Sequence, residues 1–269
     1  MNQPASLNSY TLNNGVQLVA FHPLILGTFQ NRMEKMNFIV DLVVTRHLTT
    51  FTHSVMVSYL AEAIGKHILA ARPELLRIPS SYLEGNVYAS PAEVLDYIVP
   101  AALFHDIGKN GMIPIINTQH RKLNDYEFNI IQTHPQKGSD YLSSDPDFLI
   151  YQPVALGHHR SYDGTRGYPL SFDNTASPYR DAIDLIHICD CLDAATDYLS
   201  RNYHRAKPFD VVLNELKAGR GTEYNPDMVD VILSDRELYN DLKMLTEQNR
   251  ENIYYDIYLT FVNLRKKRQ

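Results

Sequence analysis

The 269-residue sequence has no tryptophan and only two cysteines, Cys189 and Cys191. Residues two positions apart on a helix do not face each other, so we expect neither a disulfide between these cysteines nor joint binding of one ion. No apolar run approaches the roughly 20 residues that span a membrane, and the N-terminus lacks the basic and then apolar pattern of a secretory signal. These absences predict a cytoplasmic protein with no membrane span.

The chain also lacks an excess of positive charge. Its formal net charge is -6 at pH 7, which argues against broad contacts with DNA or RNA. A small anionic ligand in a local basic pocket is compatible with this charge. With 44% hydrophobic and 21% charged residues, the composition is that of an ordinary globular protein that can bury a core.

Signals for helix starts recur along the chain, whereas no run in its body alternates between apolar and polar residues as a strand would. Ser90-Pro91-Ala92-Glu93 combines an N-cap serine, a proline at the first helical position and a capping-box glutamate. Asn124 with Glu127 repeats the box, and Ser177-Pro178 and Asn225-Pro226 each pair a capping side chain with a proline. The sequence therefore predicts an all-α fold.

Three parts of the chain differ in their content. Residues 1–45 carry no motif and receive no role, although Asn13-Asn14-Gly15 would suit the turn of a small β-hairpin. Residues 46–236 hold all the motifs described below. Residues 237–269 are predicted to form a tyrosine-bearing amphipathic helix with a basic end; whether it is solvated, packs on the body or forms a dimer contact stays open.

Histidines and carboxylates stand in ordered clusters between residues 53 and 190. Imidazoles and carboxylates bind iron, manganese, zinc or nickel. Seven such groups exceed the needs of one ion, and a carboxylate shared between two ions is the economical arrangement. Two ions about 3.5–4 Å apart can contact both the attacking and the leaving oxygen of a phosphate ester. The set predicts a metal-dependent phosphodiesterase, with the candidate ligands His53, His105, Asp106, His134, His158, His159 and Asp190.

The order and spacing of these motifs resemble the HD-GYP family, the subgroup of HD-superfamily phosphohydrolases that cleaves cyclic di-GMP. The similarity spans roughly residues 50–235, and its segments are Leu103–Lys109, Gly157–His159 with Asp163-Gly164 and Gly167–Pro169, and Ile188–Asp190 leading into Asp193-Ala194. The resemblance implies an HD-superfamily helical bundle with residues 46–236 as the catalytic domain. It also implies that Gly157–Thr175 forms a long loop that carries the Gly-Tyr-Pro segment.

The resemblance further implies a role for each site residue. One ion takes His53, His105, Asp106 and Asp190, and the other takes Asp106, His134, His158 and His159. Asp106 would bridge the two ions, and a hydroxide held between them would be the nucleophile. Lys109, four residues after His105, would share its face of a helix and act with Asp106 as a catalytic residue. The implied substrate contacts are Lys109, Gly167, Tyr168, Pro169, Arg201, Tyr203 and Arg205, of which the last three would otherwise be a charged helix end.

Three departures from the family pattern change these expectations. Thr49 stands where the family often has a glutamate that reaches a third metal, so we expect two ions per chain. Arg160 replaces the glutamate of His-His-Glu, and we expect it to point outward or to contact a substrate phosphate. One extra residue in Asp163–Pro169 and about two more between Asp190 and Arg201 would reshape the guanine-binding edge.

The leading hypothesis is hydrolysis of a cyclic dinucleotide in signalling, cyclic di-GMP above all, to pGpG, and whether the reaction continues to GMP stays open. Two divalent ions would be needed, iron or manganese first, with zinc and nickel compatible. Two alternatives stay open. The first is a catalytically weak cyclic di-GMP receptor, which Arg160 favours. The second is an HD phosphohydrolase that acts on another nucleotide, against which the Gly-Tyr-Pro segment argues.

The expected partner is the cyclic dinucleotide, with no DNA, RNA or membrane; a homodimer or a signalling-protein partner stays open. The other six histidines are expected outside the site, and His187 is the one that would reach its edge because it lies three residues before Asp190.

Overall fold

The computed structural model describes residues 9–11, 17–19, 28–46, 48–80, 87–112, 122–200 and 206–266. Strands β1 (Ser9–Thr11) and β2 (Gln17–Val19) pair in antiparallel register, with Tyr10 opposite Leu18. All the other regular elements in the described ranges are helical. The all-α prediction is confirmed, and so is the small hairpin, whose Asn13-Asn14-Gly15 turn lies outside the described residues.

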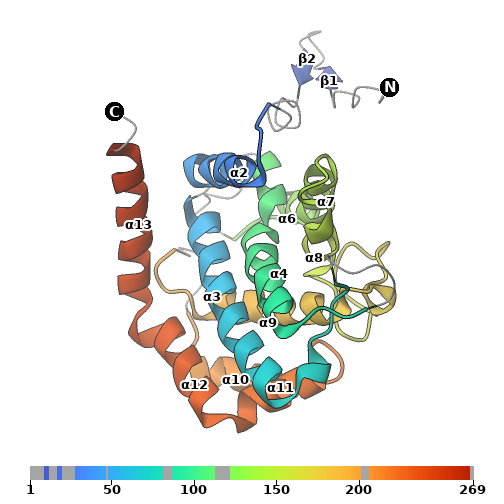
Figure 1. The fold of residues 1–269 in the computed structure, drawn as a ribbon, viewed down its shortest axis with the longest axis vertical. Coiled ribbons are helices and arrows are strands. Elements are labelled where there is room, and N and C mark those ends of the chain that lie inside the picture. Colours follow the sequence, from blue (N-terminus) through green and yellow to red (C-terminus); the bar gives the residue numbers. More distant parts are fainter. Residues whose placement is uncertain are drawn as a thin grey trace.

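The part of the chain up to Gly157 contributes the central helices of the bundle (Figure 1). Its helices are α2 (Arg32–Arg46), α3 (Leu48–Ala71), η1 (Pro73–Leu75), α4 (Pro91–Phe104), η2 (Ile107–Gly111), α6 (Asp125–Ile131), α7 (His134–Ser143), η3 (Leu149–Tyr151) and α8 (Gln152–Gly157). The rest of the chain adds η4 (Asn174–Ala176), α9 (Arg180–Thr196), α10 (Phe209–Ala218), α11 (Pro226–Ser234), α12 (Arg236–Lys243), η5 (Met244–Gln248) and α13 (Arg250–Lys266).

The long helix α3 is the centre of the molecule. It packs along α4 and against α9, which crosses behind both of them, and α10–α12 lie at the end of the bundle opposite α2 (Figure 1). Its apolar side chains, such as Met56, Leu60 and Ile64, are fully buried. A helix that is apolar on most of its faces is stabilised inside a core, so a polar residue on α3 is also carried into the interior. None of the described helices is long and apolar enough to cross a bilayer.

Three of the four helix starts that the capping signals predict are correct. Ser90 with Glu93 and Asn124 with Glu127 form complete capping boxes, and the Asn225 side chain accepts hydrogen bonds at the start of α11. The predicted start at Ser177 is wrong. The Ser177 hydroxyl accepts from the backbone N–H of Tyr179 in a turn after η4, and α9 begins only at Arg180.

The tail is divided into more elements than the single helix that the sequence predicts. Residues 236–243 form α12, the π-helical turn η5 follows, and α13 starts after Asn249. Asn249 has φ −121° and leaves the helical conformation, so the chain changes direction there. The first turn of α13, with Arg250 fully buried, is thereby directed into the body of the protein.

A buried carboxyl on α9 gives a testable dependence of stability on pH. Burial raises the pKa of Asp184 to about 7, against the hydrogen bond from Asn225 and the charge of Arg180, which lower it. An unfolded aspartate has a pKa of ~3.9, so the folded protein holds a proton that the unfolded chain releases. The resulting stabilisation is present below about pH 4 and is lost as the pH rises to about 7.

We therefore expect Asp184→Asn, which can still accept from Asn225, to match the wild type in stability at pH 4 and to exceed it at pH 8. The gain is at most a few kcal/mol, at about 1.4 kcal/mol per unit of pKa shift, and the loss of the partner of Arg180, 3.7 Å away, reduces it. Urea unfolding of both proteins at the two pH values measures the difference. A difference that does not change with pH would contradict the raised pKa.

Candidate metal centre

All seven side chains that the sequence predicts as metal ligands meet in one place. They come from five segments: His53 from α3, His105 and Asp106 from the end of α4, His134 from the start of α7, His158 and His159 from the turn after α8, and Asp190 from α9. All except His159 are buried, and only 22% of the His159 side chain is exposed. The fold therefore brings the predicted set together, and the assignment of each residue as a ligand remains a prediction.

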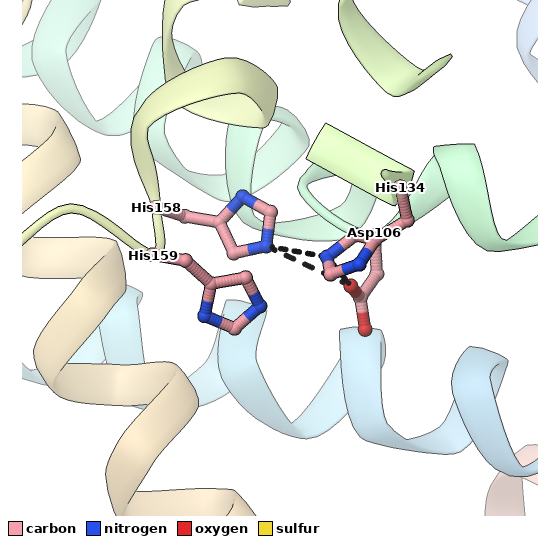
Figure 2. A group of neighbouring side chains, drawn as sticks. All are labelled: Asp106, His134, His158 and His159. Atoms are coloured by element: carbon pink, nitrogen blue, oxygen red, sulfur yellow. Dashed lines mark hydrogen bonds and ion pairs between the residues drawn. The ribbon is translucent and has the colours of Figure 1, made fainter. Parts of the chain in front are cut away.

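One group of four residues surrounds an oxygen of Asp106. The Oδ1 atom of Asp106 lies 3.1 Å from Nε2 of His134 and 3.7 Å from Nε2 of His158. His159 completes the group, in which each residue has a ligand atom within 4.8 Å of those of the others. Figure 2 shows these four side chains converging, with His158 and His159 from one turn and Asp106 and His134 from other segments of the chain. Three imidazoles and a carboxylate are a common donor set for a divalent transition metal.

A second group surrounds the other oxygen of Asp106. The Oδ2 atom lies 3.7 Å from Nε2 of His53 and 3.6 Å from Nε2 of His105. Nε2 of His53 is also 3.0 Å from Oδ1 of Asp190. The two oxygens of Asp106 thus face different groups of histidines, as a carboxylate that bridges two ions requires.

The ring nitrogens are arranged for cations rather than for hydrogen bonds with one another. Nδ1 of His105, His134 and His158 lies 2.6, 2.6 and 2.9 Å from the backbone carbonyls of Ala102, Ile131 and Ala155, so each Nδ1 carries the proton and donates it. The Nε2 atoms then present lone pairs. Those of His134 and His158 are only 3.1 Å apart, and Nε2 of His105 has no hydrogen-bond partner among the described residues. Lone pairs this close repel unless a cation lies between them, so the residues fit metal ions.

The protonation states agree with this geometry. Burial lowers the pKa of His105, His134, His158 and His159, although the nearby carboxylates act in the opposite direction. These histidines are therefore neutral at pH 7, the form in which imidazole binds metals.

The two carboxylates of the centre are ionised. Burial alone would raise the pKa of Asp106 and Asp190, but Lys109 and the histidines around Asp106, and the histidines around Asp190, hold the pKa of each carboxyl well below its usual range. His53 behaves differently from the other histidines. Burial lowers its pKa, but the hydrogen bonds with Asp190 and Asp193 outweigh burial and raise the pKa to about 9. An ion bound at Nε2 of His53 must therefore displace a proton.

Two residues that the sequence does not assign to the site, Asp193 and His187, contact candidate ligands on the side away from the centre. Nδ1 of His53 lies 2.6 Å from Oδ2 of Asp193, and Nδ1 of His187 lies 2.6 Å from the carbonyl oxygen of His158. Such contacts fix the orientation of metal-binding histidines. His187 is thus buried behind the centre rather than at its edge. A signal for both exists in their spacing, since each stands three residues from Asp190.

Lys109 is placed differently from the prediction of a helical turn after His105. Helix α4 ends at Phe104, and the chain continues from Asp106 as the tighter 3-10 helix η2. In this geometry the ammonium group of Lys109 pairs with Oδ2 of Asp106. The Lys109 side chain is partly exposed, so it lies between the carboxylate and the solvent.

The Gly-Tyr-Pro segment folds back against the turn that carries the two histidines. Arg160 and Gly167 form a β-bridge, and the N–H of Tyr168 donates to the carbonyl of His159 at 3.2 Å. The Tyr168 ring packs on the His159 ring, with 4.6 Å between their centroids. Tyr168 therefore lies beside His159, the partly exposed member of the candidate metal centre. Burial raises the pKa of its hydroxyl, which stays a hydrogen-bond donor.

The expectation for Arg160 is wrong in both of its forms, because the side chain neither points outward nor faces the metal centre. It is 4% exposed. Its Nη1 donates to the carbonyl of Arg166 at 2.8 Å, and its Nη2 donates to the carbonyl of Gly164. The guanidinium of Arg160 thus lies inside the loop that carries the Gly-Tyr-Pro segment, and it stabilises this loop through hydrogen bonds to backbone carbonyls.

The remaining predicted substrate residues divide into two groups. Gly167, Tyr168 and Pro169 lie in the loop beside the centre, whereas Arg201, Tyr203 and Arg205 lie outside the described residues. Thr49 is exposed at the start of α3, and it offers no carboxylate.

The sequence was compared with known families and proteins. Residues 50–202, more than half of the chain, match the HD domain family. A cyclic di-GMP phosphodiesterase of Vibrio cholerae serotype O1 is 26% identical over 210 residues, which cover 74% of this chain and 41% of that protein. The cyclic di-GMP phosphodiesterase response regulator RpfG of Xanthomonas campestris pv. campestris is 33% identical over 146 residues, which cover 54% of this chain and 37% of RpfG.

A third relative has a different substrate in its name. The 3'3'-cGAMP-specific phosphodiesterase 2 of Vibrio cholerae serotype O1 is 25% identical over 203 residues, which cover 74% of this chain and 37% of that protein. The chain spans less than half of the length of each of these curated relatives.

Proposed function

This chain belongs to the HD domain family, and from that premise we propose that it is a member of the HD-GYP subgroup that hydrolyses cyclic di-GMP to the linear dinucleotide pGpG. The observation that carries the proposal is the placement of Asp106. One of its oxygens faces His134 and His158, and the other faces His53 and His105. Two relatives that are named cyclic di-GMP phosphodiesterases support the choice of substrate.

We propose that each residue of the centre has a defined task. His53, His105 and Asp190 hold one ion with Asp106, and His134, His158 and His159 hold the other, with iron or manganese as the first candidates and zinc or nickel compatible. When bound, the two ions supply a water of lowered pKa and positive charge for the phosphate oxygens.

The protein's own side chains then position the substrate. Lys109 exchanges its pairing with Asp106 for a phosphate oxygen, and so adds a positive charge where negative charge builds up in the transition state. Tyr168 offers its ring to a base and its hydroxyl as a donor. Gly167 and Pro169 shape the backbone that carries Tyr168.

One assay tests this proposal against its alternatives. The purified full chain, stripped of metal and reloaded with Mn²⁺ or, without oxygen, with Fe²⁺, is incubated separately with cyclic di-GMP, cyclic di-AMP and 3'3'-cGAMP. We expect metal-dependent cleavage of cyclic di-GMP. Preferred cleavage of 3'3'-cGAMP, the substrate in the third relative's name, would replace cyclic di-GMP as the proposed substrate. Binding of cyclic di-GMP without turnover would favour the receptor hypothesis.

The number of ions is a separate prediction. Because Thr49 offers no carboxylate, the purified protein should bind two ions per chain. Metal analysis by mass spectrometry after reloading and desalting measures this number. Three fully occupied sites per chain would contradict the prediction.

The product should also depend on Thr49. In the family the step from pGpG to GMP is often linked to a third ion, whose charge helps to hold the terminal phosphate of pGpG. Arg160 cannot replace that ion, because its guanidinium is bound to loop carbonyls. We therefore expect pGpG as the main product in a time course followed by chromatography. Thr49→Glu, which returns the carboxylate, should shift the product toward GMP, and rapid conversion to GMP by the wild type would refute the prediction.

A further inference from the structure

Arg250 is the largest side chain that is completely buried in the described part of the chain. It begins α13, beyond residues 50–202 that match the HD domain family. A buried guanidinium is costly unless its N–H groups find acceptors. Here Nε donates to the carbonyl of Thr246 at 3.0 Å and Nη2 donates to the hydroxyl of Thr196 at 2.9 Å. These contacts fix the guanidinium in one orientation.

The third contact of Arg250 leads to the metal centre. Its Nη1 atom lies 2.8 Å from Oδ1 of Asp193, which is also completely buried. The other oxygen of Asp193, Oδ2, lies 2.6 Å from Nδ1 of His53. Arg250, Asp193 and His53 therefore form one continuous row of charged and polar contacts from the C-terminal helix to a predicted ligand.

The charges along α9 explain why a cation is needed at this place. Asp190 and Asp193 on α9 and Asp197 at its C-terminal cap are all buried, so three carboxylates would repel one another without a positive charge beside them. Arg250 lies 2.8 Å from Asp193 and 3.6 Å from Asp197. Without Arg250, Asp193 would lose the contact that holds its carboxylate in place, and a carboxylate that turned away would no longer present the acceptor that orients His53.

We propose that Arg250 is a positioning residue of the metal centre: through Asp193 it fixes the ring orientation and the tautomer of His53, so that Nε2 faces the ion shared with Asp190. The inference rests on the ligand assignment made under the proposed function. It means that the C-terminal helix completes the binding site of one ion. A displacement of α13 would then change the affinity of the protein for that ion, whereas its affinity for the ion assigned to the group around His134 would stay the same.

The test measures metal binding without any substrate. The metal-free full chain is titrated with Mn²⁺, and free Mn²⁺ is followed by electron paramagnetic resonance. The wild type should show two binding events. Arg250→Met and Asp193→Asn should each weaken one event about 10–100-fold, the usual effect of removing a residue that supports a metal-binding histidine, and should leave the other unchanged. The double variant should be no weaker than the weaker single variant, because both residues act through His53.

Two further variants separate positioning from general stability. Ile257→Ala removes a buried side chain from the same helix, away from the row of contacts; it should lower the melting temperature and leave both binding events as in the wild type. Arg250→Lys keeps the charge without the planar fork and should recover part of the lost affinity. If Arg250→Met alone does not fold, the double variant provides the test, since replacing both members of a buried ion pair is tolerated better than replacing one.

The outcomes distinguish this inference from the proposed function. Wild-type affinity for both ions in Arg250→Met or in the double variant would overturn the inference, as would an equal loss of the same ion in Ile257→Ala. A wild-type protein that binds two ions but leaves cyclic di-GMP intact would overturn the proposed function and leave the role of Arg250 standing.

Discussion

Replacing Asp106 with alanine should abolish hydrolysis and lower the occupancy of both ions. The reason is the position of the carboxylate, which directs one oxygen to His134 and His158 and the other to His53 and His105. A change that removes both ions and the charge they supply should cost more than the loss of a single oxyanion-hole donor, which is about 10²–10³ in rate. We therefore expect a loss of more than ~10³-fold in the initial rate, with far less than two ions per chain by metal analysis.

Single histidine variants provide the matched comparison for Asp106→Ala. His53→Ala should reduce the occupancy of one ion, and His134→Ala should reduce that of the other, because each histidine faces only one oxygen of Asp106. Asp147→Ala removes a carboxylate that pairs with Lys35 and should leave ion content and rate unchanged. If Asp106→Ala kept both ions and a rate near that of the wild type, Asp106 would not be the bridge.

The meeting of the seven candidate ligands in one place was predictable from the sequence because of their residue types and their order. Aspartate is almost never fully buried unless it is paired and imidazoles bind transition metals, so the order of these residues along the chain indicates a candidate ligand set even though their arrangement in space is unknown. The helix starts at Ser90 and Asn124 were predictable for a related reason, since a capping box involves only four neighbouring residues.

The residues that support the ligands could not be predicted in the same way. Arg250 meets Asp193 only after the chain has formed α10, α11 and α12 and changed direction at Asn249, and nothing local to Arg250 indicates its partner. Arg160 was misread because its partners are backbone carbonyls, which every residue has and which leave no pattern in a sequence. A charge beside a metal ligand suggested a substrate phosphate, whereas folding satisfied that charge within the loop.

The pairing of Lys109 with Asp106 was not predicted, because it involves a local change of helix type. A 3-10 helix advances 3.0 residues per turn rather than 3.6, so η2 places Lys109 one turn after Asp106, and its ammonium group approaches Oδ2 of Asp106, the oxygen that Nε2 of His105 also approaches. The pairing with Asp106, three residues earlier, follows directly from the tighter helix. The sequence pattern at Ile107–Gly111 does not distinguish the two helix types.

Substitution of Gly167 should show how strongly the loop positions the metal centre. Gly167 has φ +86°, a conformation that disfavours residues with a side chain, and a Cβ atom there would lie 1.8 Å from the carbonyl oxygen of His159. Gly167→Ala must therefore push the loop away from the backbone of His159. A shift of about 1 Å at a reacting centre can cost on the order of 10² in rate, so we expect a loss of at least that size and weaker binding of the ion that His159 holds.

A second glycine separates backbone strain from this steric contact. Gly221 has φ +76°, but a Cβ atom there meets nothing within 4 Å. Gly221→Ala should cost only the strain of its conformation, on the order of 1–3 kcal/mol in the free energy of unfolding, and should keep the wild-type rate and ion content. The rate of cyclic di-GMP cleavage, Mn²⁺ affinity and urea unfolding are measured for both variants. Because strain is common to both and only Gly167 touches the backbone of His159, equal rates in the two variants would mean that the loop does not position His159.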